Sequence, residues 1–140
     1  AMSNAGVMVA IDLRSGRRIW DKEIGGLEDL WVAGDYIFTL TNESDIVALS
    51  RSDGAIYWVR SLPRFKDEKK RKDPIIWTGP ILASDRLLIA GSQGQIWSIS
   101  PYSGEVLGYE DISEGISVPP VVAGNTVYFL SDDADLVAYR

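Results

Sequence analysis

Residues 118–139 read VPPVVAGNTVYFLSDDADLVAY. Residues 78–99 read TGPILASDRLLIAGSQGQIWSI, which is a second version of the same pattern. Both stretches place short alternating apolar runs, rich in β-branched and aromatic residues, between turns of Gly, Ser, Asp and Asn; this is typical of β-strands. A pattern that recurs in this way indicates a repeat protein, in which one structural unit is stacked several times.

Turn glycines give the length of the repeat. Gly16, Gly54 and Gly104 occupy matching turns, and their spacing indicates a period of about 40 residues that is interrupted once by about ten residues. The interruption is the charged stretch PRFKDEKKRKDP at residues 63–74. In the first unit we expect strands at residues 7–13 and 17–24, and in the second unit at 30–33, 36–41, 46–50 and 55–62. Four strands in about 40 residues are the signature of a propeller blade.

The predicted fold is therefore all-β, a partial β-propeller of about three four-stranded antiparallel blades. Residues 1–6, AMSNAG, read as a cloning remnant. The rest divides into the outer strands of a preceding blade (7–29), a blade (30–62), a charged insertion between blades (63–76), a blade (77–113) and a final blade that lacks its outer strand (114–140).

The composition excludes several kinds of chemistry. The chain has no cysteine and no histidine, so disulfides, thiol catalysis and the usual general base and metal ligand are excluded. Its formal net charge of −6 argues against general binding of nucleic acid. No catalytic, metal-binding or cofactor-binding motif is present, so we predict a protein that is not an enzyme and has no cofactor.

One repeat motif carries a family resemblance. Residues 10–20, AIDLRSGRRIW, match the pattern A-x-D-x-x-[ST]-G-x-x-x-W at every specified position, and residues 48–58 keep its Ala, Gly and Trp. This pattern resembles the tryptophan-docking repeat of quinoprotein-like propellers. The resemblance implies structural roles for five positions, Gly16, Trp20, Gly54, Trp58 and Gly104.

Most of the chain is similar to BamB-like outer-membrane protein assembly factors. The similar segments are GDYIFTLTN, the charged insertion leading to DPIIWTGPIL, then SPYSGEVLG, SVPPVVAGNTVYFL and DADLVAYR. The resemblance implies a C-terminal part of a ring of about eight blades, acting as a scaffold without catalytic activity at the periplasmic face of the outer membrane. It also implies that an N-terminal lipid, absent from this chain, holds the protein to that membrane. The implied partner is the central barrel-inserting subunit, BamA.

The insertion is the candidate site for a protein partner. Residues 64–73 contain six basic and three acidic residues, a net charge of +3 within an acidic chain. A basic loop of this kind can steer an acidic partner surface, although a charged run is also typical of a plain solvent-exposed loop. The candidate contact residues are Arg64, Phe65, Lys69, Lys70, Arg71, Lys72 and Trp77.

Two further features have simpler interpretations. The acidic run at residues 132–135 could hold Ca²⁺, but it aligns with ordinary turns of the other units and is more typical of a turn. Most of the five tryptophans are expected to pack within or between blades. Because a partial ring exposes a bare strand edge, we expect the isolated chain to self-associate. Two alternatives to a scaffold stay open, namely part of a quinone-dependent dehydrogenase and part of a ligand-sensing propeller.

Overall fold

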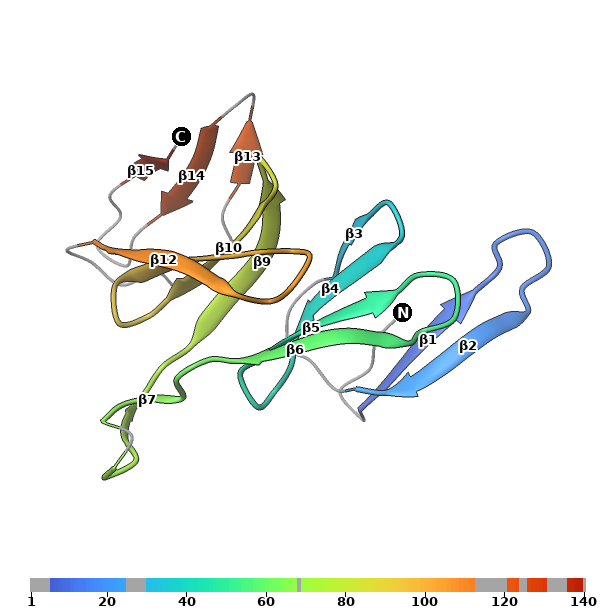
Figure 1. Ribbon diagram of the computed structural model, residues 1–140, viewed down its shortest axis with the longest axis horizontal. Helices are drawn as coiled ribbons and strands as arrows, with labels where there is room; N and C mark the ends of the chain where they lie inside the picture. Colours follow the sequence, from blue (N-terminus) through green and yellow to red (C-terminus); the bar gives the residue numbers. More distant parts are fainter. Residues whose placement is uncertain are drawn as a thin grey trace.

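The computed structural model describes residues 6–24, 30–67, 69–112, 121–123, 126–130 and 136–139, which form β-strands and turns. Figure 1 shows the sheets one after another in chain order, each packed beside the next. None of the described residues forms a helix long and apolar enough to cross a membrane. The predicted all-β propeller class is therefore confirmed.

Two sheets have four antiparallel strands each, and both follow sequence order. The first is β3 (Trp31–Ala33), β4 (Tyr36–Leu40), β5 (Asp45–Ser50) and β6 (Ile56–Ser61). The second is β9 (Trp77–Ala83), β10 (Arg86–Gly91), β11 (Gln95–Ile99) and β12 (Val106–Asp111). Each is one meandering blade, with β3 and β9 in the first position and β6 and β12 in the last.

The two ends of the described chain form smaller sheets. A two-stranded sheet pairs β1 (Val7–Ile11) with β2 (Arg18–Glu23). A three-stranded sheet holds β13 (Val121–Ala123), β14 (Thr126–Leu130) and β15 (Leu136–Tyr139). The division of the whole chain into blades at the predicted boundaries stays a prediction, since parts of those boundaries lie outside the described residues.

The first strand is shorter than the predicted range of residues 7–13. It ends at Ile11 because Asp12 begins a turn: its Oδ1 accepts hydrogen bonds from the backbone N–H groups of Arg14, at 2.8 Å, and Ser15, at 3.2 Å. An aspartate that bonds to the backbone two and three residues ahead is a typical turn initiator. The sequence pattern of alternating apolar residues continued into this turn and made the strand look longer.

The central strands are apolar on both faces because each blade packs between two neighbours. In β5, Val47 and Leu49 contact the β1–β2 sheet, while Ile46 and Ala48 contact the next blade. The same division recurs in β10, where Leu87 and Ile89 face one side and Leu88 and Ala90 the other. The core therefore consists of layers between blades, which explains near-continuous apolar strands where a half-exposed sheet would alternate.

A tryptophan links each blade to the turn of the next. Trp20 in β2 donates a hydrogen bond from Nε1 to the carbonyl of Arg51, at 2.9 Å, and a Cβ added to Gly54 would lie 2.7 Å from its indole. No other residue type fits this approach, because any side chain would collide with the ring. Trp58 in β6 repeats the arrangement at Gly104 and the carbonyl of Pro101, with an Nε1–O distance of 2.8 Å.

Candidate protein-binding site

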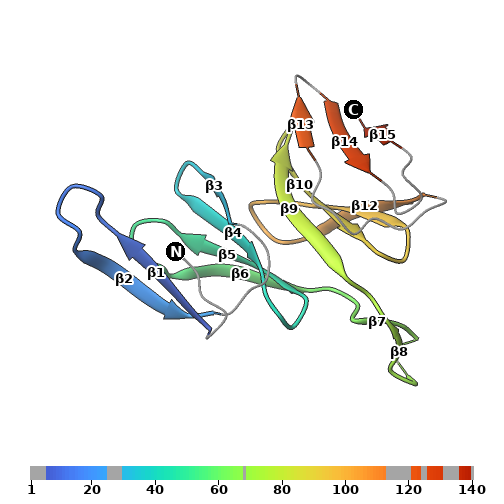
Figure 2. The same ribbon diagram turned by 180° about the vertical axis from the view of Figure 1, so that it is seen from behind.

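The charged insertion folds as a β-hairpin. Strand β7 (Phe65–Asp67) pairs with β8 (Lys72–Pro74), with Phe65 opposite Pro74 and Asp67 opposite Lys72. At the tip the backbone N–H of Lys70 donates to Oδ1 of Asp67, at 3.2 Å. Figure 2 shows the hairpin projecting away from the two four-stranded blades. The sequence indicated only a charged loop here, since residues 64–73 carry few β-branched residues.

Backbone hydrogen bonds tie the base of the hairpin to both neighbouring blades. On one side the N–H of Leu62 donates to the carbonyl of Ser44, at 2.9 Å, in the β4–β5 turn. On the other side Ile76 and Ser92, in the β10–β11 turn, are joined twice: the Ile76 N–H donates to the Ser92 hydroxyl, at 2.8 Å, and the Ser92 N–H to the Ile76 carbonyl, at 2.9 Å. The hairpin is therefore held in a fixed direction relative to both blades.

Trp77 lies beneath the hairpin and joins it to the blade core. Its side chain is only 3% exposed, and its Nε1 donates to the carbonyl of Pro63, at 2.8 Å. Its ring meets that of Trp97 edge to face, with centroids 5.5 Å apart. Trp77 was predicted as a partner contact, but a ring buried to this degree supports the hairpin from below and offers little surface to a partner.

The basic side chains are concentrated at the exposed part of the hairpin. Lys69, Lys70, Arg71 and Lys72 are all exposed, whereas Phe65 is half-buried against the base. Four neighbouring cations on a projecting element create a local positive potential on a chain of net charge −6. This arrangement can attract an acidic surface over a distance of about one Debye length, roughly 8 Å at physiological salt.

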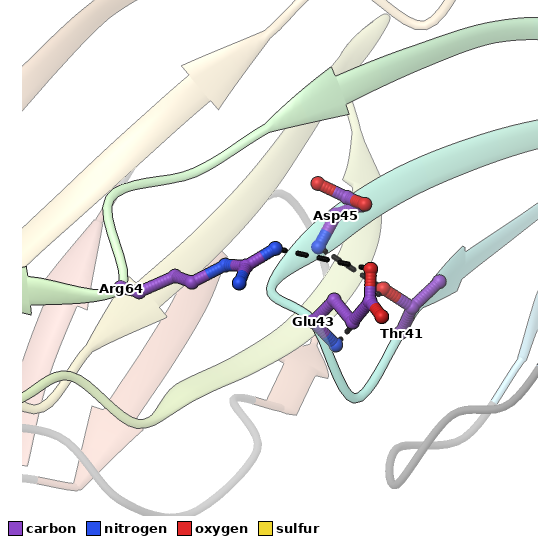
Figure 3. Close-up of polar contacts among 4 residues, drawn as sticks. All are labelled: Thr41, Glu43, Asp45 and Arg64. Carbon is purple, nitrogen blue, oxygen red and sulfur yellow. Dashed lines mark hydrogen bonds and ion pairs between the residues drawn. The ribbon is translucent and has the colours of Figure 1, made fainter.

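Arg64 at the base reaches across to the neighbouring turn, as Figure 3 shows. Its guanidinium lies 3.8 Å from the carboxylate of Glu43, and both side chains are more than half exposed. An exposed pair at this distance adds little stability, typically less than about 1 kcal/mol. The turn itself is fixed by Thr41, whose hydroxyl oxygen accepts from the backbone N–H groups of Glu43, at 3.3 Å, and Asp45, at 3.1 Å.

A hollow of about 420 Å³ lies beside the hairpin base. Two glutamines contribute to its wall and were not recognised from the sequence: Gln95 Oε1 accepts from Gln93 Nε2, at 3.2 Å, and from the indole of Trp97, at 3.0 Å. Glutamines in a turn give no signal of such a network, because it depends on side chains from three strands. The full lining is Pro63, Phe65, Lys66, Ile75, Gln93 and Gln95.

The other predicted features lie elsewhere or outside the described residues. The acidic run at residues 132–135 falls outside them. Within the described part of the chain, no cluster of three or more acidic, histidine or cysteine side chains could hold a metal ion. The repeat positions Gly16, Trp20, Gly54, Trp58 and Gly104 lie at turns and strands between blades, away from the hairpin, and serve the packing described above.

Comparison with known proteins gives the same picture for sequence and fold. A family model described as outer membrane protein assembly factor BamB matches residues 1–60. BamB of Alkalilimnicola ehrlichii is 26% identical over 100% of this chain and 34% of its own length, and BamB of Salmonella typhimurium is 27% identical over 99% and 33%. The chain thus spans about a third of the length of these curated relatives.

A solved structure has the same fold over nearly all of the chain. The crystal structure of BamB from Moraxella catarrhalis superposes with a TM-score of 0.74 and 18% identity, covering 98% of this chain and 44% of that one. A computationally designed protein, Ika4, superposes with a TM-score of 0.71 at 11% identity. At these identities the structural likeness establishes the fold alone.

Proposed function

The chain is BamB-like and built of quinoprotein-type β-propeller repeats, and we propose that it is part of a protein-binding scaffold that assists the assembly of β-barrel proteins in the outer membrane. The observation that carries the proposal is the similarity to BamB proteins along the whole chain, in sequence and in fold. The reported relatives are named as assembly factors, which favours a scaffold over a dehydrogenase or a ligand sensor.

The proposed partner is the barrel-inserting subunit of the assembly machinery, and the proposed contact is the β7–β8 hairpin. Two observations support this contact. The hairpin base is fixed by backbone hydrogen bonds to both flanking blades, so little conformational entropy is lost when a partner binds. The tip presents Lys69, Lys70, Arg71 and Lys72 to solvent, which suits an acidic partner surface.

The proposed location is the periplasmic face of the outer membrane, with attachment through a lipid on the parent protein. Support for this comes from the printed names of the relatives. The isolated chain is further proposed to self-associate through the open side of the β1–β2 sheet, where a hollow of about 640 Å³ has apolar side chains in its lining.

Charge reversal of the hairpin tests the partner contact. The variant Lys69→Glu, Lys70→Glu, Lys72→Glu should bind the periplasmic part of the barrel-inserting subunit about tenfold more weakly, mainly through slower association, because the attractive potential changes sign. The measurement is surface plasmon resonance at two salt concentrations. The control variant Arg14→Glu, Arg17→Glu, Arg86→Glu makes the same change in net charge at exposed positions outside the hairpin.

The comparison of the two variants decides between outcomes. Weaker binding in the hairpin variant alone supports the contact. Equal weakening in both variants means that only net charge matters, and unchanged binding in both removes the hairpin from the interface.

A further inference from the structure

Three turns of the chain have the same backbone conformation. The glycine of each turn has φ of +70°, +75° or +76°, in a region that other residues rarely adopt. In each turn the glycine N–H donates to the carbonyl four residues earlier, at 2.8 to 2.9 Å. The three glycines are Gly16, Gly54 and Gly104, and the carbonyls belong to Asp12, Ser50 and Ser100.

Two of these turns are covered by an indole, and the third is not. The rings of Trp20 and Trp58 lie so close to Gly54 and Gly104 that an added Cβ would be 2.7 Å and 2.5 Å from them. At Gly16 an added Cβ would have no heavy atom within 4 Å. The same backbone shape is therefore present at Gly16 with its packing surface open.

The polar and apolar parts of the covered sites are matched at the open turn. Each docked indole donates to the carbonyl three residues before the turn glycine, and at Gly16 that position is Leu13. The apolar residue next to the turn is Leu49 in the covered blade, which is 0% exposed, and Ile11 at the open turn, which is 50% exposed. The Leu13 side chain itself is 99% exposed.

We infer that the Gly16 turn, with the Leu13 carbonyl and the Ile11 side chain, is a binding site for a tryptophan carried on a β-hairpin of the same repeat type. The indole would lie flat on Gly16 and donate its N–H to the Leu13 carbonyl. Adjacent apolar side chains of the hairpin would cover Ile11. The inference does not rest on the proposed partner or location of the protein.

A second copy of this chain does not offer such a tryptophan from its β12 strand. The position that holds Trp20 in β2 and Trp58 in β6 holds Gly108 in β12, and the indoles of Trp20 and Trp58 are already hydrogen-bonded within their own chain. The occupant that fits the site is therefore a tryptophan-bearing hairpin from another polypeptide segment.

The chain itself supplies a probe for the test. A fluorescein-labelled peptide of residues 45–61, DIVALSRSDGAIYWVRS, copies the β5–β6 hairpin and carries the docking tryptophan. Fluorescence anisotropy should show this peptide binding to the chain, and a Trp58→Ala peptide binding at least about tenfold more weakly, since it lacks the ring and its hydrogen bond. Equal binding of the two peptides would overturn the inference.

Two glycine variants of the chain locate the site. Gly16→Asn places a side chain where the indole would lie, and Asn tolerates positive φ better than most residues. Gly34→Asn is the matched control, because Gly34 has φ of +57° and also has no heavy atom within 4 Å of an added Cβ. Gly16→Asn should weaken binding at least about tenfold and Gly34→Asn should leave it unchanged.

A tethered version covers the case in which the short peptide does not fold alone. The same 17 residues are joined ahead of residue 6 by a flexible linker, which gives an effective concentration in the millimolar range. Hydrogen exchange of the added indole N–H, followed by NMR, should slow at least about tenfold and return to the free rate in Gly16→Asn. Exchange at the free rate in the tethered protein would refute the site.

Self-association provides the last check. If Gly16→Asn abolished self-association in sedimentation experiments while Gly34→Asn did not, the occupant would be a second copy, and the assignment to a separate hairpin would be wrong.

Discussion

At the scale of single residues, the junctions between blades depend on a glycine that receives an indole. The turn needs positive φ, and the indole needs the absence of a Cβ, so one residue type meets both conditions. The tryptophan in turn satisfies a backbone carbonyl of the next blade, at Arg51 or Pro101, which ties packing and hydrogen bonding to one side chain.

Substitution of Gly104 by alanine should show both conditions at once. Gly104→Ala should lower the free energy of unfolding by about 3 kcal/mol, from backbone strain plus displacement of the Trp58 ring. Gly34→Ala, with positive φ but open space, should cost only about 1–2 kcal/mol. Urea unfolding of both variants measures the difference, and equal losses would mean that ring displacement contributes nothing.

The turn before Gly54 gives a pH-dependent prediction. The backbone N–H of Ala55, and then the hydroxyl of Ser50, lower the pKa of Asp53 below its usual value. Because the folded-state pKa is depressed, Asp53 contributes stability above the usual aspartate pKa, and this contribution is lost as the pH falls through the lower folded-state value.

Asp53→Asn should therefore unfold with less dependence on pH in the acidic range than the parent chain. Unfolding in urea at a series of acidic pH values measures this dependence. Identical pH profiles for the two proteins would contradict the role of this carboxylate.

At the scale of elements, the sequence predicted the blade strands better than the insertion. Alternating β-branched and aromatic residues identified β4, β5 and β6 to within a residue or two, because strands that pack between two blades have little freedom in composition. The β7–β8 hairpin gave no such signal, since its residues are mostly charged. Its strands form because hydrogen bonds at its base bring Arg64 and Ile75 together.

The β4–β5 turn beside the hairpin should depend on the hydroxyl of Thr41. Thr41→Val keeps the shape but removes the acceptor for two backbone N–H groups, so the free energy of unfolding should fall by about 1 kcal/mol. Thr41→Ser keeps the hydroxyl and should lose less. Thermal and urea unfolding compare the two variants, and a larger loss in the serine variant would mean that the methyl group matters more than the hydrogen bonds.

At the scale of the whole molecule, the described sheets form a row with an open side at β1–β2. The hollow there has Met8, Leu30, Val32 and Ile37 among its lining residues, and Val32 is 51% exposed. Exposed apolar surface beside a two-stranded sheet favours association with another chain.

Val32→Lys should shift the isolated chain toward the monomer, because a charge at this position opposes burial against a second copy. Sedimentation velocity over a range of concentrations measures the shift. Ile76→Lys, at an exposed apolar residue beside the hairpin, is the control and should not change association. A parent chain that stays monomeric at high concentration would contradict the proposed self-association.

The sequence by itself determined the repeat, its all-β class and the residues of the blade turns. These properties are local, since a strand's alternation and a turn's glycine are imposed by the backbone conformation of the same few residues. The candidate hairpin was identified from its charge, but not as a hairpin.

Only the tertiary structure decided which side chains meet. It placed Trp77 beneath the hairpin, brought Gln93, Gln95 and Trp97 into one network, and showed the Gly16 turn open where Gly54 and Gly104 are covered. These relations join residues of different blades, and contacts between separate sheets depend on how the sheets stack rather than on the residues next to each position in the chain.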